Sequence, residues 1–449
     1  MPKLWDHLKQ RQTWGFLVVF LSLLFTQLVQ PLSLAGSTMH IYVVEYFLIA
    51  LFCGACVHIL ITKQKIQLKA LEFVLLALFG VWFVVLTLYR YVYAGTITGG
   101  FIVFRVLVFP IILVLLLRQY KIERKTVALA VFFFLTLVNL YQIYSLFGVS
   151  HSFRQIKGLK NINIYLCFAL AALPMLIAFL ASYQSECRKK VIAVKAMGIF
   201  NVLAITCFSL FSGSRIAVCL CPVIAAVSYF LVNRITWKSV KVFLIMAAAV
   251  AALVASIIAL NIYDAEYNFY RVTDTMFPAL HLEQRIDHSD ETLGEQIPDV
   301  TEETQMNEAQ ASAAQNAADS DNMRAILWEK SIFYIRQNPI FGRHTIDIDA
   351  EFTFGETGEV HTIIESPHNF ILEMWLALGL PGMLVYLLMI ALCAFKVLLS
   401  KLSISRKANF LLVMLAIFGF SFFQPLVTCF FAVSLMLWLT MYLFIEPAK

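Results

Sequence analysis

The stretch Phe370–Phe395 reads FILEMWLALGLPGMLVYLLMIALCAF and contains one charged residue, Glu373. A transmembrane α-helix needs about 20 predominantly apolar residues to cross the hydrocarbon core of a bilayer. This stretch is long enough and apolar enough to do so. We therefore expect Phe370–Phe395 to span a membrane.

The composition of the whole chain agrees with this expectation. Hydrophobic residues make up 61% of the 449 residues and charged residues only 14%. In a soluble domain about 45–50% of the residues are apolar and about 25% are charged. A soluble enzyme and a nucleic-acid-binding protein are therefore excluded, and no nucleic-acid partner is expected. The nine Cys residues lie in or beside apolar segments, so the sequence predicts neither a disulfide framework nor a cysteine metal site.

Twelve stretches are candidates to span the membrane, which predicts an all-α polytopic membrane protein with about 12 transmembrane helices. Residues 1–262 hold the first nine helices, residues 263–367 form one large extracytoplasmic loop before the tenth, and residues 368–449 hold helices 10 to 12. The expected spans are Trp14–Leu34, His40–Ile61, Leu71–Tyr89, Ile97–Leu117, Val127–Phe147, Asn163–Tyr183, Val191–Phe211, Arg215–Asn233, Val240–Ile262, Phe370–Phe395, Phe410–Gln424 and Leu426–Ile445.

The basic residues predict the orientation of these helices. They gather before the first helix and after the second, fourth, sixth, eighth and tenth, which is every alternate loop. Cytoplasmic loops carry an excess of Lys and Arg, so both termini should be cytoplasmic. The segment 263–367 should then be outside, and 21 of the 28 acidic residues fall there, between Asp264 and Glu365.

The extracytoplasmic loop divides into two parts. Residues 287–322 are rich in Asp, Glu, Gln and Ala, and such a segment cannot bury enough apolar surface to fold, so it should be a disordered acidic spacer. Met323–Gln337 carries apolar residues at helical spacing, and Asn338-Pro339 should end that helix. A short irregular run should follow up to Pro367. We expect residues 323–367 to fold against the membrane face.

Several cations lie on the predicted outer side, against the usual bias. Arg binds phosphate oxygens through paired charge-assisted hydrogen bonds, so a phosphate-bearing ligand at the outer surface would explain them. The alternative is that each side chain reaches lipid headgroups or pairs with the acidic loop. The cations are Arg154, Lys157 and Lys160 between helices five and six, Arg215 in the turn Ser212-Gly213-Ser214-Arg215, and Arg324, Arg336 and Arg343 in the loop.

His368 is the strongest candidate for a catalytic residue. It follows Ser366-Pro367 at the start of the tenth helix, and a neutral imidazole can accept a proton near pH 7, although a histidine there can also be a simple cap. Arg105 lies inside the fourth span and is a candidate to line an inner cavity. The pair Asp347 and Asp349 resembles a metal-binding spacing, but its predicted outer location argues against a metal site.

The motifs around His368 resemble those of the O-antigen ligase and Wzy-type polysaccharide polymerase superfamily. His368-Asn369, nine residues, and then Gly379-Leu380-Pro381-Gly382 match its H-N-x9-G-x-x-G signature. The turn that ends at Arg215 is similar to its helix-opening arginine. The resemblance covers roughly residues 154–395, and it also rests on Met323-Arg324, Leu327-Trp328-Glu329, Asn338-Pro339-Ile340-Phe341-Gly342, and Arg154, Gly158 and Asn163.

The resemblance implies a glycosyltransferase in the bacterial cytoplasmic membrane with its active site on the outer face. The donor would be an undecaprenyl-diphosphate-linked oligosaccharide, and the acceptor a hydroxyl group that His368 deprotonates. Arg215, with Arg154 and Arg324 as helpers, would stabilise the leaving diphosphate without a metal or cofactor, and the product would be inverted. Pro381 should disturb its helix and free carbonyl groups that line a substrate groove. The remaining substrate-binding candidates are Asn369, Lys157, Arg343 and Arg105.

The preferred interpretation is a polysaccharide polymerase for O-antigen, capsule or exopolysaccharide. Its partners would include membrane lipids, a chain-length regulator and a flippase. The alternatives are an O-antigen ligase or a protein O-oligosaccharyltransferase of the same family, and a lipid-linked oligosaccharide flippase or other transporter. A transporter would need neither the His-Asn pair nor a large outer loop, and it is often built from two similar halves.

Overall fold

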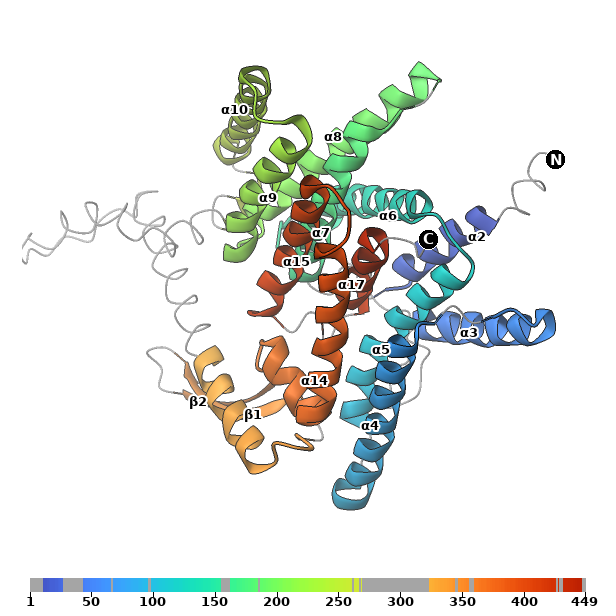
Figure 1. The fold of residues 1–449 in the computed structure, drawn as a ribbon. Coiled ribbons are helices and arrows are strands. Elements are labelled where there is room, and N and C mark those ends of the chain that lie inside the picture. Colours follow the sequence, from blue (N-terminus) through green and yellow to red (C-terminus); the bar gives the residue numbers. More distant parts are fainter. Residues whose placement is uncertain are drawn as a thin grey trace, which may run out of the picture.

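The structure is a computed structural model in which most of the chain consists of long helices (Figure 1). It describes residues 11–26, 43–65, 68–95, 98–154, 162–184, 186–260, 262–265, 268, 323–343, 346–354, 359–424, 427 and 431–445. The long helices are α2 (Arg11–Leu24), α3 (Val43–Thr62), α4 (Ala70–Ala94), α5 (Thr98–Gln119), α6 (Arg124–Ser145), α7 (Ile162–Ser182), α8 (Arg188–Phe211), α9 (Arg215–Asn233), α10 (Trp237–Ala259), α14 (Phe370–Leu398), α15 (Ile404–Ser421) and α17 (Phe431–Phe444).

The helices have the lengths and composition of a multi-pass membrane protein. Within the described ranges, nine are long and apolar enough to cross a bilayer, while α2 and α17 are shorter apolar helices. Each of the twelve predicted spans overlaps one of the twelve long helices, α5 included, with boundaries that shift by several residues, as where α15 begins at Ile404 rather than Phe410. The helical membrane fold is thus supported in outline, and the number of twelve spans stays a prediction.

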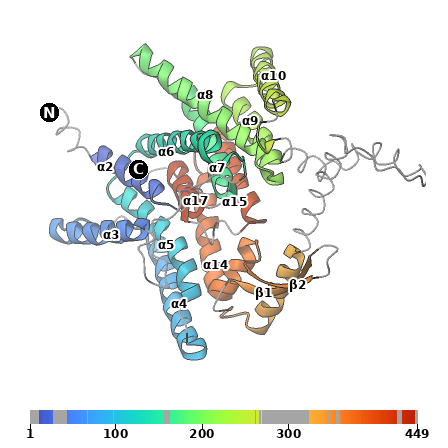
Figure 2. The ribbon, with the colours of Figure 1, turned by 180° about the vertical axis from the view of Figure 1, so that it is seen from behind.

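The helices at the centre of the bundle are buried, and others lie at its edge. Residues 164–173 of α7 and 431–441 of α17 are buried without interruption, as expected for helices that are apolar all round and surrounded by neighbours. Figures 1 and 2 show α7, α15 and α17 in the middle, with α3, α4 and α10 at the periphery. The most apolar part of α10 has no buried residue, so its side chains are free to face lipid.

The helix α14 is broken at the Gly-Leu-Pro-Gly element, as predicted from Pro381. Gly379 has φ 66° and ψ 172°, a conformation that is essentially restricted to glycine. The carbonyl oxygens near the break accept hydrogen bonds from side chains of α4: Trp82 Nε1 donates to Leu378 O at 2.7 Å, and the Arg90 guanidinium donates to Leu376 O and Ala377 O. The expectation that these carbonyls line a substrate groove is therefore wrong for those three, because α4 side chains occupy them.

The loop segment before α14 docks into this break. The backbone N–H of Arg343 donates to Leu376 O at 2.7 Å, and that of Leu380 donates to Pro339 O at 3.2 Å. A Cβ atom at Gly379 would overlap the carbonyl oxygen of Ile340, and one at Gly342 would overlap that of Leu376. Glycine is required at both positions because two backbones approach each other directly.

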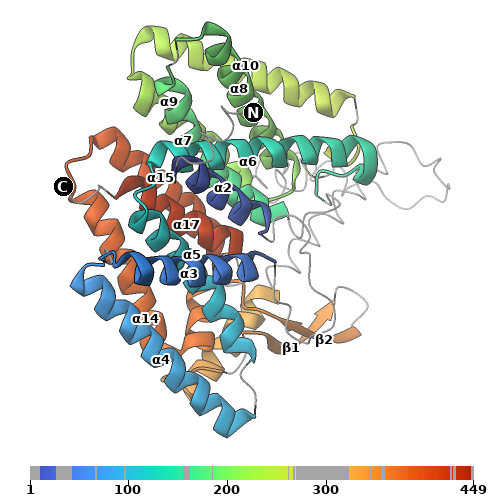
Figure 3. The ribbon, with the colours of Figure 1, turned by 90° about the vertical axis from the view of Figure 1, so that its right-hand side faces the viewer.

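The segment before α14 contains a helix and a β-hairpin. A helix covers residues 323–337 and ends before Asn338-Pro339, as the spacing of its apolar residues predicts. The irregular run expected next is instead partly a hairpin of β1 (Ile348–Phe354) and β2 (Glu359–Glu365), paired antiparallel with Ile348 opposite Glu365. The all-α prediction is thus wrong for this segment. The hairpin lies beside the N-terminal end of α14 (Figure 3).

A small core joins these pieces to the bundle. Leu327 and Ile335 from the helix over residues 323–337, Ile348 from β1 and Leu376 from α14 are buried together. Burial of apolar side chains stabilises the arrangement by about 25 cal/mol per Å² removed from water. This core holds β1 against α14, and β1 in turn pairs with β2, the strand that leads into His368. The expected acidic spacer, residues 287–322, and the expected break at Pro425 lie outside the described residues.

Candidate active site

His368 lies in a short, tightly held connection between β2 and α14. The Trp328 Nε1 group donates to the carbonyl oxygen of Pro367 at 2.7 Å, which fixes the residue before the histidine. His368 itself has φ 55°, a left-handed conformation that is uncommon for residues other than glycine. Asn369 then caps α14, because its Oδ1 accepts from Ile371 N and Leu372 N. The ring is therefore positioned from both sides of the backbone.

Glu365 forms a hydrogen-bonded pair with His368. The distance from Glu365 Oε1 to His368 Nε2 is 2.7 Å, with 38% of the glutamate side chain and 13% of the histidine side chain exposed. In the tautomer that donates from Nε2, the Nδ1 atom is the proton acceptor. Nδ1 is buried and has no hydrogen-bond partner among the described residues. A substrate hydroxyl can reach it only after the ring or its neighbours move.

The charge of Glu365 is stabilised by its neighbours. The hydrogen bond from His368 lowers the pKa of the Glu365 carboxyl group, burial opposes this, and the positive charge of Arg324 lowers it further. A carboxylate that stays ionised can orient an imidazole and stabilise the imidazolium ion formed when it takes a proton. Glu365, His368 and Arg324 thus form one electrostatic unit at the predicted outer surface.

A second group of charges surrounds Arg343. Its guanidinium group stacks over the Tyr334 ring at 3.9 Å, and its Nη2 atom lies 3.5 Å from Asp349 Oδ2. Burial and the charge of Glu365 raise the pKa of Asp347, while Arg343 opposes them. Asp347 is therefore near both Glu365 and Arg343, and Arg343 is held by an aromatic face and a carboxylate. Within the described residues, no group of three or more His, Cys, Asp or Glu side chains is placed to hold a metal ion.

Arg154 and Arg215 share another neighbourhood. Asp264 accepts hydrogen bonds from Ser152 Oγ at 2.6 Å and from Phe153 N at 2.7 Å, which fixes the backbone before the exposed Arg154. The Phe153 ring lies 5.2 Å from that of Phe211, just before the Ser212-Gly213-Ser214 turn. Arg215 follows as the first residue of α9. Convergence of these two arginines with His368 stays a prediction.

The remaining predicted residues have different surroundings. Arg105 Nη1 lies 3.0 Å from Glu45 Oε2, and the two side chains are only 4% and 1% exposed. This buried pair gives Arg105 a structural partner. The Oδ1 atom of Asn369 is used by the helix cap, so only its amide NH₂ group is left for a substrate. Lys157 lies outside the described residues.

Two residues of this region were not predicted. Glu365 precedes His368 by three positions, and an acid at that spacing before a candidate base is the signal that could have identified it. Arg90 lies at the predicted outer end of α4, and it holds the loop by donating to Arg343 O at 2.6 Å. Its position against the positive-inside bias was the available signal.

Comparison with known proteins supports the resemblance drawn from the motifs. Residues 199–387 match the family model described as O-Antigen ligase. The matched region contains Arg215, Arg324, Arg343, Glu365 and His368, together with the Gly-Leu-Pro-Gly break. No curated protein matches the chain. The match confirms the family resemblance and supports glycan transfer at a membrane.

Proposed function

We propose that this chain, whose residues 199–387 match the O-antigen ligase family, is a membrane glycosyltransferase that lengthens a polysaccharide. Its donor would be a glycan on undecaprenyl diphosphate, and its acceptor a hydroxyl group of a carrier-linked repeat unit. The hydrogen-bonded pair of Glu365 and His368, 2.7 Å apart at the start of α14, is the observation that carries this function. It supplies a positioned base next to cations inside the matched region.

The reaction is a single displacement at the anomeric carbon. His368 accepts the proton of the acceptor hydroxyl, and the hydroxyl oxygen forms a bond to the anomeric carbon. The bond between that carbon and the diphosphate oxygen breaks, and the diphosphate leaves with both electrons of that bond. One displacement inverts the anomeric configuration. Glu365 stabilises the imidazolium ion that His368 becomes.

The leaving diphosphate needs positive charge rather than a proton. Guanidinium groups donate paired hydrogen bonds to phosphate oxygens and favour the charge that builds up as the bond breaks. Arg215, Arg154, Arg324 and Arg343 are the candidates, and Lys157 and Asn369 complete the proposed substrate-binding set. Arg105 has a weaker claim because it pairs with buried Glu45. We expect the reaction to proceed in the presence of EDTA.

The decisive experiment is elongation by the purified chain. Synthetic undecaprenyl-diphosphate oligosaccharide is incubated with the protein in detergent and EDTA, and product length is measured by mass spectrometry. We expect elongation that His368→Ala reduces by about 10²–10⁴-fold, the usual contribution of general base catalysis. The matched control is His58→Ala, on an exposed position of α3, which should keep full activity. Undiminished elongation by His368→Ala would remove the base assignment.

A ligase is the second candidate, because the matched family model is described by that activity. Adding a lipid-core saccharide or an acceptor protein to the same assay separates the alternatives. Transfer to that acceptor without lengthening of the carrier-linked glycan would identify a ligase or a protein O-oligosaccharyltransferase. Movement of the labelled carrier across a vesicle membrane without a new glycosidic bond would identify a transporter.

A further inference from the structure

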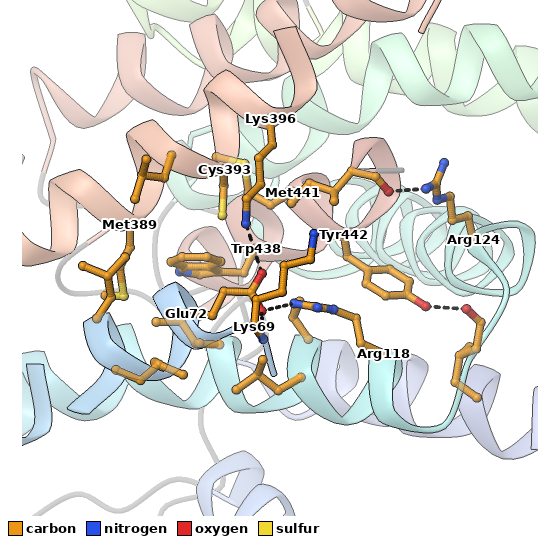
Figure 4. Close-up of a pocket in the computed structure, with 18 of the residues that line it drawn as sticks. Lys69, Glu72, Arg118, Arg124, Met389, Cys393, Lys396, Trp438, Met441 and Tyr442 are labelled. Atoms are coloured by element: carbon orange, nitrogen blue, oxygen red, sulfur yellow. Dashed lines mark hydrogen bonds and ion pairs between the residues drawn. The ribbon is translucent and has the colours of Figure 1, made fainter. Parts of the chain in front are cut away.

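A cavity of about 780 Å³ lies at the end of α14 opposite to His368. It is formed by α4, α5, the connection to α6, α14 and α17 (Figure 4). Met389, the first residue of α14 that lines the cavity, lies 19 positions after Phe370, which is about 28 Å along a helix. All lining residues fall outside 199–387. The cavity is therefore separate from the candidate active site and from the region matched by the family model.

The lining of this cavity carries an excess of positive charge. Six cations face two acids, Glu72 and Glu123, which leaves an excess of four positive charges. Lys69, Lys121 and Lys125 are exposed. Such an excess at a pocket favours a ligand with net negative charge. The six cations are Lys69, Arg118, Lys121, Arg124, Lys125 and Lys396.

Glu72 organises the charged end of the cavity. Its Oε2 atom accepts from Arg118 Nη1 at 3.0 Å, and its Oε1 atom accepts from Lys396 Nζ at 3.1 Å. The backbone N–H of Lys69 also donates to this carboxylate at 3.2 Å. One carboxylate thus holds two side-chain cations from α5 and α14 in fixed positions. Figure 4 shows these groups converging on the cavity.

The rest of the cavity is apolar and aromatic. Side chains from four helices form a wall of the kind that packs against hydrocarbon chains, and Trp438 and Tyr442 join it from α17. Aromatic residues of this kind are common where a bilayer meets water. The aliphatic residues and methionines of the wall are Leu71, Leu75, Leu76, Ile111, Val114, Leu115, Met389, Leu392 and Met441.

We propose that this cavity binds an anionic phospholipid, with its phosphate at the cations and its acyl chains against the apolar wall. Basic pockets between transmembrane helices on the cytoplasmic side recognise such headgroups, and the loops that supply these cations are those predicted to be cytoplasmic. A volume of about 780 Å³ is within the range of about 300–1,000 Å³ that holds a drug-sized ligand. A free phosphate ion would leave the apolar wall unused, so the lipid is the better match.

The test is a titration of the purified full chain in non-ionic detergent. Dioctanoyl phosphatidylglycerol, dioctanoyl phosphatidylcholine and inorganic phosphate are added separately, and the unfolding midpoint is followed, because a ligand that binds the folded state raises it. We expect phosphatidylglycerol to raise the midpoint at concentrations where the other two have no effect. An equal response to phosphatidylcholine, or a response to inorganic phosphate alone, would overturn the anionic-lipid assignment.

Lysine variants test whether phosphatidylglycerol binds in this cavity. We expect the triple variant Lys69→Gln, Lys121→Gln and Lys125→Gln to bind phosphatidylglycerol at least tenfold more weakly. The matched control changes Lys189, Lys190 and Lys238 to Gln, three exposed lysines on α8 and α10, and should keep the wild-type affinity. Equal loss in both triple variants would show general surface attraction and contradict a built site.

A second variant tests the apolar wall without a change of charge. Leu392→Trp should fill part of the cavity and weaken binding of phosphatidylglycerol by a similar factor. If this variant fails to fold, the lysine variants still decide the matter. Unchanged affinity in a folded Leu392→Trp protein would contradict insertion of the acyl chains.

Discussion

The backbone of His368 is held in a conformation that costs free energy, and its neighbours explain how it is maintained. A non-glycine residue in the left-handed region costs of order 1–3 kcal/mol, and His368 has φ 55°. The hydrogen bond from Trp328 to Pro367 O and the Asn369 cap fix the residues on either side. Strained residues of this kind cluster at functional sites. Backbone strain at His368 is what we expect if its imidazole ring must point in one direction to accept a proton.

The first prediction concerns Glu365→Gln and the pH dependence of stability. The pKa of Glu365 is lowered in the folded protein from its ordinary value of 4.5. A carboxyl group with a lowered folded pKa contributes stability that is present above pH 4.5 and is lost as the pH falls through the folded pKa. We expect wild type to unfold at a higher temperature than Glu365→Gln above about pH 5, and this difference to shrink below pH 4.5.

Thermal unfolding followed at pH 7, 5.5, 4.5 and 3.5 measures that difference. Glu351→Gln, on an exposed position of β1, is the matched control and should show no comparable gap at any pH. A gap for Glu365→Gln that stays constant down to pH 3.5 would rule out the charge of Glu365 as its cause.

The second prediction concerns Gly379→Ala. An alanine at φ 66° and ψ 172° is strained, and its Cβ would overlap Ile340 O, so we expect a loss of at least about 2 kcal/mol of stability. Gly80→Ala in α4 is the control, because no atom lies within 4 Å of its added Cβ. Chemical unfolding of both variants measures the change. Equal stability of the two would mean that the break in α14 does not require glycine.

At the level of helices and strands, the sequence predicts what depends on local pattern. Long apolar runs identify the helices, apolar spacing identifies the helix over residues 323–337, and Pro381 with its glycines identifies the break in α14. These features follow from residues within one or two turns of each other. The geometry of each depends little on distant parts of the chain.

The features that were missed depend on distant residues. The β1–β2 hairpin forms from Ile348–Phe354, where apolar and polar residues alternate, and Glu359–Glu365, where the adjacent Ile363 and Ile364 break that alternation, so only one of the two strands carries the local signal. Strand formation depends on its packing partners, and here the small core with α14 supplies them. Arg90 contacts Arg343 and Leu376, which are 253 and 286 positions away. No spacing rule connects residues so far apart.

The third prediction tests Arg90 as the link between α4 and the loop before α14. Arg90→Met keeps the length and apolar stem of the side chain but removes its hydrogen bonds to Arg343 O, Leu376 O and Ala377 O. Hydrogen bonds to a charged group contribute about 1.5–3 kcal/mol, so we expect a loss of about 2 kcal/mol. Hydrogen exchange at the backbone amides of Arg343 and Leu380 should become faster.

Arg406→Met, at an exposed position near the start of α15, is the control for the loss of one positive charge. It should leave exchange at those two amides unchanged. Exchange in Arg90→Met that matches wild type would mean that backbone contacts alone hold the loop against α14.

For the whole molecule, α14 connects two charged regions of different character. At its first residue lies the Glu365–His368 pair beside Arg324, and near its last residue lies the cation-rich cavity around Glu72. If α14 spans the membrane, these regions face opposite sides. The distribution of basic loops assigns the His368 end to the outside, and the proposed glycan transfer depends on that assignment because the lipid-linked donor is expected there.

The fourth prediction tests this assignment with two cysteine variants. Glu351→Cys is on exposed β1 near the first end of α14, and Lys401→Cys is in the exposed turn after its last residue. A membrane-impermeant maleimide should label Glu351→Cys in intact cells, and Lys401→Cys only after permeabilisation. Both variants are made in Cys187→Ser protein, because the exposed Cys187 lies in a predicted cytoplasmic loop and would itself be labelled after permeabilisation. The reverse pattern would put His368 on the cytoplasmic side, where an outer-face polymerase could not use it, and would move the cation-rich cavity to the outer leaflet.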